Sequence, residues 1–198
     1  ELEQRIAALS VIAKVAPEQA MRFLTARVIA LSSGAFARSL MIEAGMEQGV
    51  RKGQPVLDAG GLVGRVVEAG RTTSQVLLIT DPQSRVPVEV GQARTRAILT
   101  GDHDSLPHLE FVPRGVGIVA GEAIATSGTG GGFPRGLRVG VTTLTADGLR
   151  VEVAGRLDVV DYVSVLLIDP SIVETGEHTV TSSPTDARQR AKDPRKKQ

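Results

Sequence analysis

Apolar and polar residues alternate in short runs along most of the chain, and glycine, proline and aspartate separate these runs. From residue 22 to about residue 169 the runs are rich in β-branched residues, as is typical of strands with one solvent-facing side. The clearest runs are residues 26–31, 63–67, 76–79, 85–90, 122–126, 137–142 and 149–153. Asp147-Gly148, between the last two runs, predicts a tight two-residue hairpin. About a dozen short strands at this spacing predict a sandwich or closed barrels.

The first segment has a different periodicity. Apolar residues recur at alternating intervals of four and three, which predicts one apolar face on a helix over residues 1–16. This seam consists of Leu2, Ile6, Leu9, Ala13 and Ala16. Pro17 ends the pattern because proline lacks the amide hydrogen that a helix needs. About two heptads do not establish a coiled coil, so two interpretations stay open: a helix packed on its own domain, and the end of a longer dimerising helix.

A weak internal repeat favours two barrels over one. Gly61–Val66 followed by Val76–Pro82 is similar to Gly136–Val141 followed by Val165–Pro170, although chance similarity of strands also explains such short copies. The predicted fold is mainly β, with a short N-terminal amphipathic or coiled-coil helix and two small β-barrel domains. The predicted ranges are a helix over 1–20, barrels over 21–95 and 96–172, and a disordered basic tail over 173–198.

Composition narrows the possible functions. Cysteine is absent, which excludes zinc ribbons, Fe–S clusters, thiol catalysis and disulfides. Aromatic residues make up only 3% of the chain, which argues against stacking on bases or sugars. Residues 180–198 carry a net charge of +4, so the preceding part carries −3 and does not resemble a nucleic-acid binder. No apolar run is long enough to span a bilayer. The first residue is not Met and lies inside the predicted helix, so we expect a fragment, and any preceding segment lies outside this sequence.

A glycine-rich stretch over residues 127–136 is the first candidate for a phosphate-binding loop. It fails the dinucleotide fingerprint because Phe133 and Arg135 stand where glycine is required, and it fails the P-loop pattern because Leu137 stands where lysine is required. A strand rather than a helix follows it, so it cannot hold phosphate at a helix N-terminus. A tight turn with glycines at positive φ is the better interpretation.

Catalytic and metal-binding residue types are sparse. His103-Asp104-Ser105 contains the residue types of a catalytic triad, but adjacent residues cannot form the hydrogen-bond relay. Asp102, His103, Asp104 and His108 are possible metal ligands, yet aspartate-rich loops are common and we predict no metal. The sequence has no positive evidence for an enzyme, and no catalytic, cofactor or metal site is predicted.

Three blocks of residues resemble the MreC family of rod shape-determining proteins. They are Gly60–Val66, Ser74–Val88 and Thr126–Gly140, and their order and spacing are similar to those of the family over roughly residues 22–169. The last block resembles the family stretch written as T-S-G, a glycine pair, F-P-x-G-L and V-G. This chain departs from the family pattern in having three glycines at 130–132 and in lacking the upstream transmembrane helix.

The resemblance implies a non-catalytic scaffold of the cell-elongation complex, the elongasome, which serves peptidoglycan biosynthesis and cell shape. It implies a single-pass protein of the bacterial inner membrane with this region in the periplasm. The implied partners are cytoplasmic MreB and membrane-embedded MreD, and the synthase pair of RodA and the elongation-specific class B penicillin-binding protein. Homodimers or higher assemblies are implied as well, and no cofactor or nucleic acid. The alternative is a two-barrel hydrolase of chymotrypsin-like architecture, which requires a histidine and a serine to converge between the barrels.

The family-motif residues carry over as structural determinants. They are Gly61, Gly64, Asp81, Ser84, Pro87, Ser127, Gly128, Gly130, Gly131, Phe133, Pro134, Gly136, Leu137 and Gly140. The glycines are expected to shape turns or permit close strand approach, and the prolines to lie at an edge, bulge or turn. Asp81 and Ser84 are expected to bracket a turn at Pro82. Phe133 is expected to plug a barrel end, the alternative being an exposed partner contact.

Overall fold

The computed structural model describes residues 22–33, 38–102, 106–155 and 160–168, and β-strands dominate this part of the chain. In chain order the strands are β1 (Arg22–Ser33), β2 (Arg38–Ile42), β3 (Pro55–Leu57), β4 (Leu62–Ala69), β5 (Ser74–Leu78), β6 (Arg85–Val90), β7 (Thr95–Thr100), β8 (His108–Glu110), β9 (Ala123–Thr126), β10 (Arg138–Thr145), β11 (Gly148–Val153) and β12 (Tyr162–Leu167). A 3₁₀ turn, η1 (Met46–Gln48), lies between β2 and β3. No helix in the described ranges has the length and apolar character needed to cross a bilayer. The predicted helix over 1–20 and nearly all of the predicted tail lie outside these ranges.

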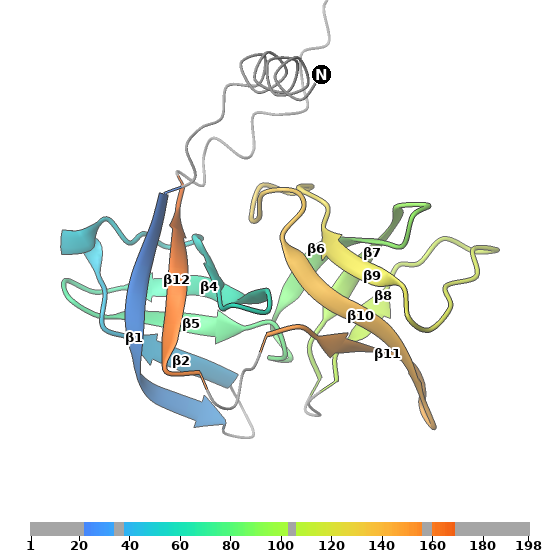
Figure 1. The fold of residues 1–198 in the computed structure, drawn as a ribbon, viewed down its shortest axis with the longest axis horizontal. Helices are drawn as coiled ribbons and strands as arrows, with labels where there is room; N and C mark the ends of the chain where they lie inside the picture. Colours follow the sequence, from blue (N-terminus) through green and yellow to red (C-terminus); the bar gives the residue numbers. More distant parts are fainter. Residues whose placement is uncertain (1–21, 34–37, 103–105, 156–159, 169–198) are drawn as a thin grey trace, which may run out of the picture.

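The first sheet is a closed antiparallel barrel in the order β1-β12-β3-β4-β5-β2. Figure 1 shows the last strand, β12, lying in the barrel formed by the first part of the chain. It pairs with β1 from Arg22 opposite Leu167 to Arg27 opposite Tyr162, and on its other side with β3. Register shifts between Val28 and Ala30 and between Val66 and Glu68 mark bulges, which bend strands and so help a small sheet to close.

The second sheet has the order β11-β10-β9-β6-β7-β8 and is also antiparallel. Its two edge strands approach each other, since the Val151 amide of β11 donates a 2.8 Å hydrogen bond to the Pro107 carbonyl just before β8. The chain is therefore mainly β, with two six-stranded antiparallel barrels, as the sequence predicts. Alternate side chains of each strand point into the barrel, as the sequence pattern predicts. In β6 these are Val86, Val88 and Val90, and all three are buried.

The predicted boundary between the barrels, at residue 95, is wrong. Strands β6 and β7 belong to the second barrel, so the change of sheet comes earlier, between β5 and β6. The second barrel is continuous in sequence from β6 to β11, whereas the first is completed only by β12. The cause is that β1 and β3 each expose an unpaired edge that the last strand satisfies, and alternation within a strand does not specify its neighbour.

The internal repeat does not correspond to a structural duplication. Its first copy runs through β4 and β5, which are neighbours in the first barrel. Its second copy begins in β10 of the second barrel but ends in β12 of the first. The similarity reflects two strands of like composition in each copy rather than one repeated unit.

The hairpin predicted at Asp147-Gly148 is present, one residue earlier than expected. Thr145 pairs with Gly148, so Ala146 and Asp147 form the two-residue connection between β10 and β11. Gly148 has φ of +109°, a conformation that favours glycine at the end of such a turn.

Candidate functional site

The glycine-rich loop joins β9 to β10 in the second barrel. Its backbone turns at Gly128, Gly130 and Gly131, where φ is +80°, +76° and +69°, and again at Gly136, where φ is +89°. A side chain at Gly130 would meet no atom within 4 Å, so glycine is required there by backbone conformation and not by lack of space. Residues with a side chain are strained in this region, and β-branched residues most of all.

Thr126 closes the base of the loop, and the sequence reasoning did not include it among the site residues. Its hydroxyl donates a 2.5 Å hydrogen bond to the Pro134 carbonyl and accepts a 2.9 Å bond from the Leu137 amide. Its backbone exchanges further bonds with Gly136 and Leu137. Because Thr126 is 1% exposed, these buried groups would lose their partners if the hydroxyl were removed. Thr126 is the first residue of the T-S-G stretch, and this position is the feature of the sequence that could have indicated its role.

Phe133 and Leu137 hold the loop to the hydrophobic core. Phe133 is 3% exposed and Leu137 is 9% exposed, and both belong to the buried core cluster. Phe133 thus has almost no surface to offer a partner, which argues against the exposed-contact alternative. Burial of two large apolar side chains contributes on the order of 3–6 kcal/mol to folding in area terms.

The outer side of the loop contacts β6. The Arg135 guanidinium donates to both carboxylate oxygens of Glu89 at 2.7 and 2.8 Å. The Arg135 side chain is 55% exposed, so solvent screening limits the pair to about 1 kcal/mol. The Ser127 amide donates to the Pro87 carbonyl at 3.0 Å, and the Ser127 hydroxyl accepts from the Thr129 amide at 3.2 Å.

Pro87 is not at an edge, bulge or turn as predicted, because β6 lies between β9 and β7. It is tolerated since the β6–β9 ladder ends at Val88 opposite Thr126. In an antiparallel ladder the N–H and C=O of one residue point to the same neighbour. The missing Pro87 donor would thus point toward Ser127, one residue beyond β9. Pro134 lies in the loop, as predicted.

Asp81 is the centre of the junction between the barrels. It is 0% exposed, and its carboxylate accepts hydrogen bonds from the Gln83 amide at 2.7 Å and the Arg38 amide at 2.5 Å. Its carbonyl accepts the Ser84 amide at 2.8 Å, so Asp81 and Ser84 do bracket the turn at Pro82. A side-chain carbon at Gly101 would lie 2.0 Å from the Asp81 carbonyl oxygen. The start of β2 and the turn after β5 therefore meet at the buried carboxylate of Asp81, and the end of β7 packs against its backbone carbonyl.

A second junction lies at the turn before β4. The Asp58 carboxylate accepts the amides of Gly60 and Gly61 at 2.8 and 2.9 Å. A side-chain carbon at Gly60 would lie 2.1 Å from the Ala154 carbonyl oxygen, and one at Gly61 would lie 2.5 Å from that of Arg138. This turn of the first barrel thus packs backbone against backbone on the second.

Gly64 and Gly140 permit close approach within each barrel. A side-chain carbon at Gly64 would lie 2.1 Å from the Leu77 carbonyl oxygen, and one at Gly140 would lie 2.1 Å from that of Glu152. Glycine is the only residue that leaves these contacts free of a clash.

Titratable side chains gather where the edge strands β8 and β11 approach each other. His108 lies 3.3 Å from the Glu110 carboxylate through Nε2 and 3.9 Å from that of Asp102 through Nδ1, and Arg150 donates to Asp102 at 3.0 Å. The Thr100 hydroxyl and then His108 lower the pKa of Glu110 from its ordinary value of 4.5, and Arg85 lowers it further, while partial burial opposes them. This charge network spans the closing edge of the second barrel.

In the part of the chain that the structure describes, the polar side chains of the glycine loop, the two junctions and the β8–β11 edge make hydrogen bonds and ion pairs. Within those ranges no three histidine, aspartate or glutamate side chains are grouped so as to hold a metal ion. Of the predicted candidates, His103 and Asp104 lie outside the described residues, as do the seam residues Leu2, Ile6, Leu9, Ala13 and Ala16.

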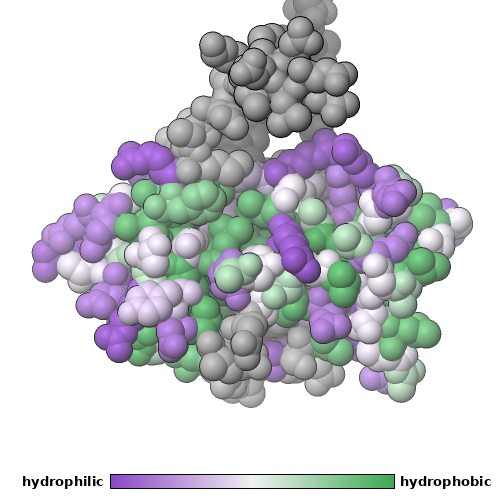
Figure 2. All heavy atoms as spheres, viewed as in Figure 1, coloured by the Kyte–Doolittle hydropathy of each residue, from purple (hydrophilic) through white to green (hydrophobic). Residues whose placement is uncertain are grey.

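Exposed apolar side chains mark two faces. On the first barrel they lie on β1 and β12, where Figure 2 shows apolar atoms gathered beside polar ones; Phe23 is 55% exposed and Tyr162 61%. On the second barrel, Val119 is 63% exposed and Leu144 73%, and the Val119 carbonyl accepts a hydrogen bond from Thr142, two residues before Leu144. Phe111, in the same loop as Val119, is 80% exposed at φ of +58°, a strained conformation for a bulky residue.

Comparison with known proteins accounts for this arrangement. The family model described as rod shape-determining protein MreC, barrel core, matches residues 28–167, which include nearly all of both barrels. The chain belongs to the MreC family. The crystal structure of MreC from Pseudomonas aeruginosa is similar, with a TM-score of 0.68 and 31% identity over 73% of this chain and 99% of that one.

Curated relatives agree with that assignment. The cell shape-determining protein MreC of Caulobacter vibrioides is 46% identical over 72% of this chain and 41% of its own length. That of Cereibacter sphaeroides is 38% identical over 84% of this chain and 56% of its length. The chain thus spans about half the length of these relatives. A structure of a penicillin-binding protein, PBP2, in complex with MreC from Helicobacter pylori has the same fold, with a TM-score of 0.59 and 12% identity.

Proposed function

We propose that this chain is the periplasmic barrel region of a non-catalytic scaffold that maintains cell shape. The whole protein is anchored in the inner membrane and links the MreB and MreD machinery to the peptidoglycan synthases, RodA and the elongation-specific class B penicillin-binding protein. The observation that carries the proposal is the family match over both barrels, from residue 28 to residue 167.

The chemistry of the described residues supports a scaffold better than the hydrolase alternative. A triad between the barrels needs a histidine at the junction, but His108 lies at the β8–β11 edge of the second barrel with Glu110 and Asp102. The junction itself consists of buried backbone contacts around Asp81 and Gly61.

The partner proposed first is the penicillin-binding protein, because a homologue of this chain forms such a complex. Its contact surface is proposed to be the exposed apolar patch of the second barrel, Val119 with Leu144. Both side chains are largely exposed, and the Val119 carbonyl is bonded to Thr142, two residues before Leu144 on β10. Interfaces concentrate their binding energy in a few large apolar groups.

Binding of the purified penicillin-binding protein tests this assignment. The double variant Val119→Ser/Leu144→Ser should weaken binding at least tenfold, while Phe23→Ser on the first barrel should leave the affinity within about twofold. Circular dichroism and thermal melts establish that both variants are folded. Equal loss in both variants would place the contact elsewhere, and no binding by the unaltered chain would contradict the partner itself.

Self-association is proposed through the helix of the first 20 residues. Two heptads are marginal alone, so this chain should be monomeric or weakly dimeric, and a longer chain with the preceding heptads should dimerise more tightly. Ile6→Asp with Leu9→Asp should weaken the longer dimer in sedimentation experiments without changing the thermal melt of the barrels. Unfolded barrels at unchanged association would instead mean that the seam packs on its own domain.

A further inference from the structure

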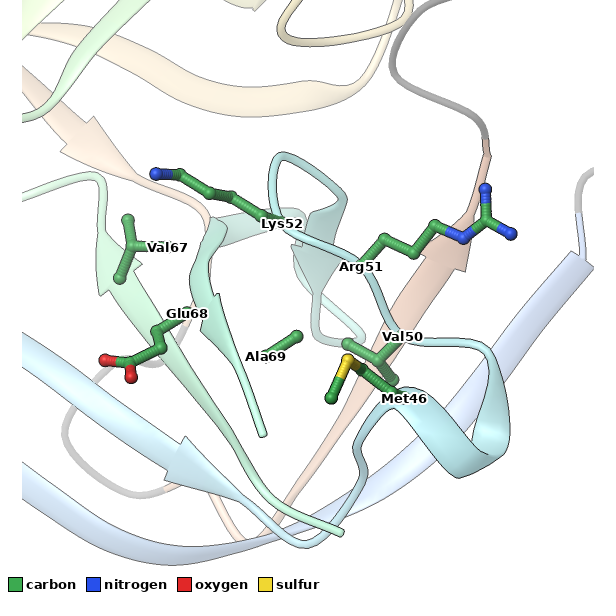
Figure 3. Close-up of a pocket in the computed structure, with 7 residues that line it drawn as sticks. All are labelled: Met46, Val50, Arg51, Lys52, Val67, Glu68 and Ala69. Atoms are coloured by element: carbon green, nitrogen blue, oxygen red, sulfur yellow. The ribbon is translucent and has the colours of Figure 1, made fainter. Parts of the chain in front are cut away.

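A pocket of about 550 Å³ opens on the first barrel between η1 and β4. Its apolar wall consists of Met46, Val50, Val67 and Ala69, and Met46 is 59% exposed although it lies beside the fully buried Val50. Figure 3 shows Met46, Val50 and Ala69 close together at the centre of this pocket. A pocket of this volume has room for one or two apolar side chains.

The rim of the pocket is basic on one side. Arg51 and Lys52 follow Val50 in the chain, and Figure 3 shows their side chains extending in opposite directions along the pocket. On the other side Glu68 directs its carboxylate away from both. An occupant that matches the pocket therefore combines apolar side chains with carboxylates, since long cationic side chains cover apolar surface while holding their charge at its edge.

The last described residue of the chain lies beside this pocket. Gln54, which is 2% exposed, donates a 3.0 Å hydrogen bond from Nε2 to the Ile168 carbonyl, and its Oε1 accepts the Arg51 amide at 2.9 Å. A side-chain carbon at Gly49 would lie 4.0 Å from Leu167. The chain that follows Ile168 consequently begins next to the residues that form the rim.

The segment after Ile168 has the apolar and acidic residues that match the pocket and its basic rim. Residues 169–177 read Asp-Pro-Ser-Ile-Val-Glu-Thr-Gly-Glu, with three carboxylates and no lysine or arginine. Ile172 and Val173 are adjacent, and Val180 is the one larger apolar residue after them in the sequence. Four extended residues span roughly 13 Å, and Ile168 is one hydrogen-bonded residue, Gln54, away from Arg51 of the rim. Pro170 favours an extended conformation at the residue before it.

We propose that residues 169–177 bind back onto the first barrel, with Ile172 and Val173 in the pocket and Glu174 beside Lys52. The segment would then hold the C-terminal end of β12, the strand that completes the first barrel, against the η1–β3 connection. The basic end of the chain, residues 188–197, does not fit this site because its charge has the same sign as the rim.

Methionine methyl resonances test the proposal in the full 198-residue chain. The chain has three methionines, and Met46 lies in the pocket whereas Met41 lies on β2. With Ile172→Asp and Val173→Asp together, the Met46 methyl signal should move toward the position of a solvent-exposed methionine, and that of Met41 should stay unchanged. Val180→Asp is the matched control and should move neither signal.

Charge reversal makes the test specific to this occupant. Lys52→Glu should displace the segment and shift the Met46 signal in the same way, and adding Glu174→Lys should restore the original position. Backbone amide spectra confirm that the barrels stay folded in each variant. An unchanged Met46 signal in the Ile172→Asp/Val173→Asp variant would overturn the proposal, and a Met46 signal that moves with protein concentration would assign the pocket to a second copy of the chain instead.

Discussion

The buried carboxylate of Asp81 accepts a 2.5 Å hydrogen bond from the backbone amide of Arg38, 43 residues earlier in the chain. This contact joins the turn after β5, where the chain leaves the first barrel, to the start of β2 within that barrel. A buried carboxylate held by backbone amides is stable only while every bond is made, because removing either partner leaves a buried polar group unsatisfied.

Replacing Asp81 should therefore destabilise the whole junction. Asp81→Ala leaves the amides of Arg38 and Gln83 without acceptors, and the free energy of unfolding should fall by about 2–4 kcal/mol. Urea unfolding followed by circular dichroism measures the change. Glu43→Ala, at an exposed position, is the control and should change the free energy by less than about 0.5 kcal/mol. Equal small effects at both positions would mean that the junction does not depend on this carboxylate.

Valine in the glycine loop should be costly at positions with positive φ. Gly130→Val or Gly131→Val should each reduce the free energy of unfolding by roughly 1–3 kcal/mol, because a β-branched residue is strained there. Gly130→Asn should cost less, since asparagine tolerates the left-handed region. Gly132→Ala should be close to neutral because its added carbon meets no atom within 4 Å. A fully stable Gly130→Val protein that had lost one partner would show that the loop is a binding surface instead.

Stability should depend on the ionisation of Glu110. The folded state lowers the pKa of this carboxyl below its ordinary value of 4.5, so the ionised form stabilises the fold above that pH. The contribution is lost as pH falls through the lower, folded-state pKa. The difference in unfolding free energy between the unaltered chain and Glu110→Gln should therefore shrink as the pH falls below 4.5. Glu152→Gln, exposed on β11, serves as the control, and a pH-independent difference for Glu110→Gln would contradict the account.

The last strand should be essential to the first barrel. Val165 of β12 is fully buried between β1 and β3, so Val165→Asp should unfold the first barrel by placing an unpaired charge in its core. Ser164→Asp, one residue away on the outer face, should be tolerated. Amide hydrogen exchange distinguishes the barrels, with loss of protection expected in β1, β3 and β4. Loss confined to β6–β11 would contradict the observed topology.

The sequence predicted features that depend on neighbouring residues. Alternation located β6 at its observed bounds, and the density of glycine at 128–131 indicated the positive φ values, because both properties are local. The hairpin after β10 was placed within one residue for the same reason.

Features that depend on distant residues were missed. The three-residue strands β3 and β8 are too short to show alternation, and they exist because longer strands pair with them. Nothing within residues 162–167 indicates that they return to the first barrel, and nothing near Asp81 points to Arg38 as its partner. The role of Thr126 was missed since its hydroxyl contacts residues eight and eleven positions later.

Restoration of cell shape tests the proposed scaffold function most directly. A rod-shaped bacterium that lacks its own MreC would carry this chain behind the membrane anchor and helix of the lost protein. Rod-shaped growth is the predicted result, with Val119→Ser/Leu144→Ser cells losing the rod shape although the protein accumulates and folds. Round cells that contain normal amounts of the folded, unaltered chain would contradict the account.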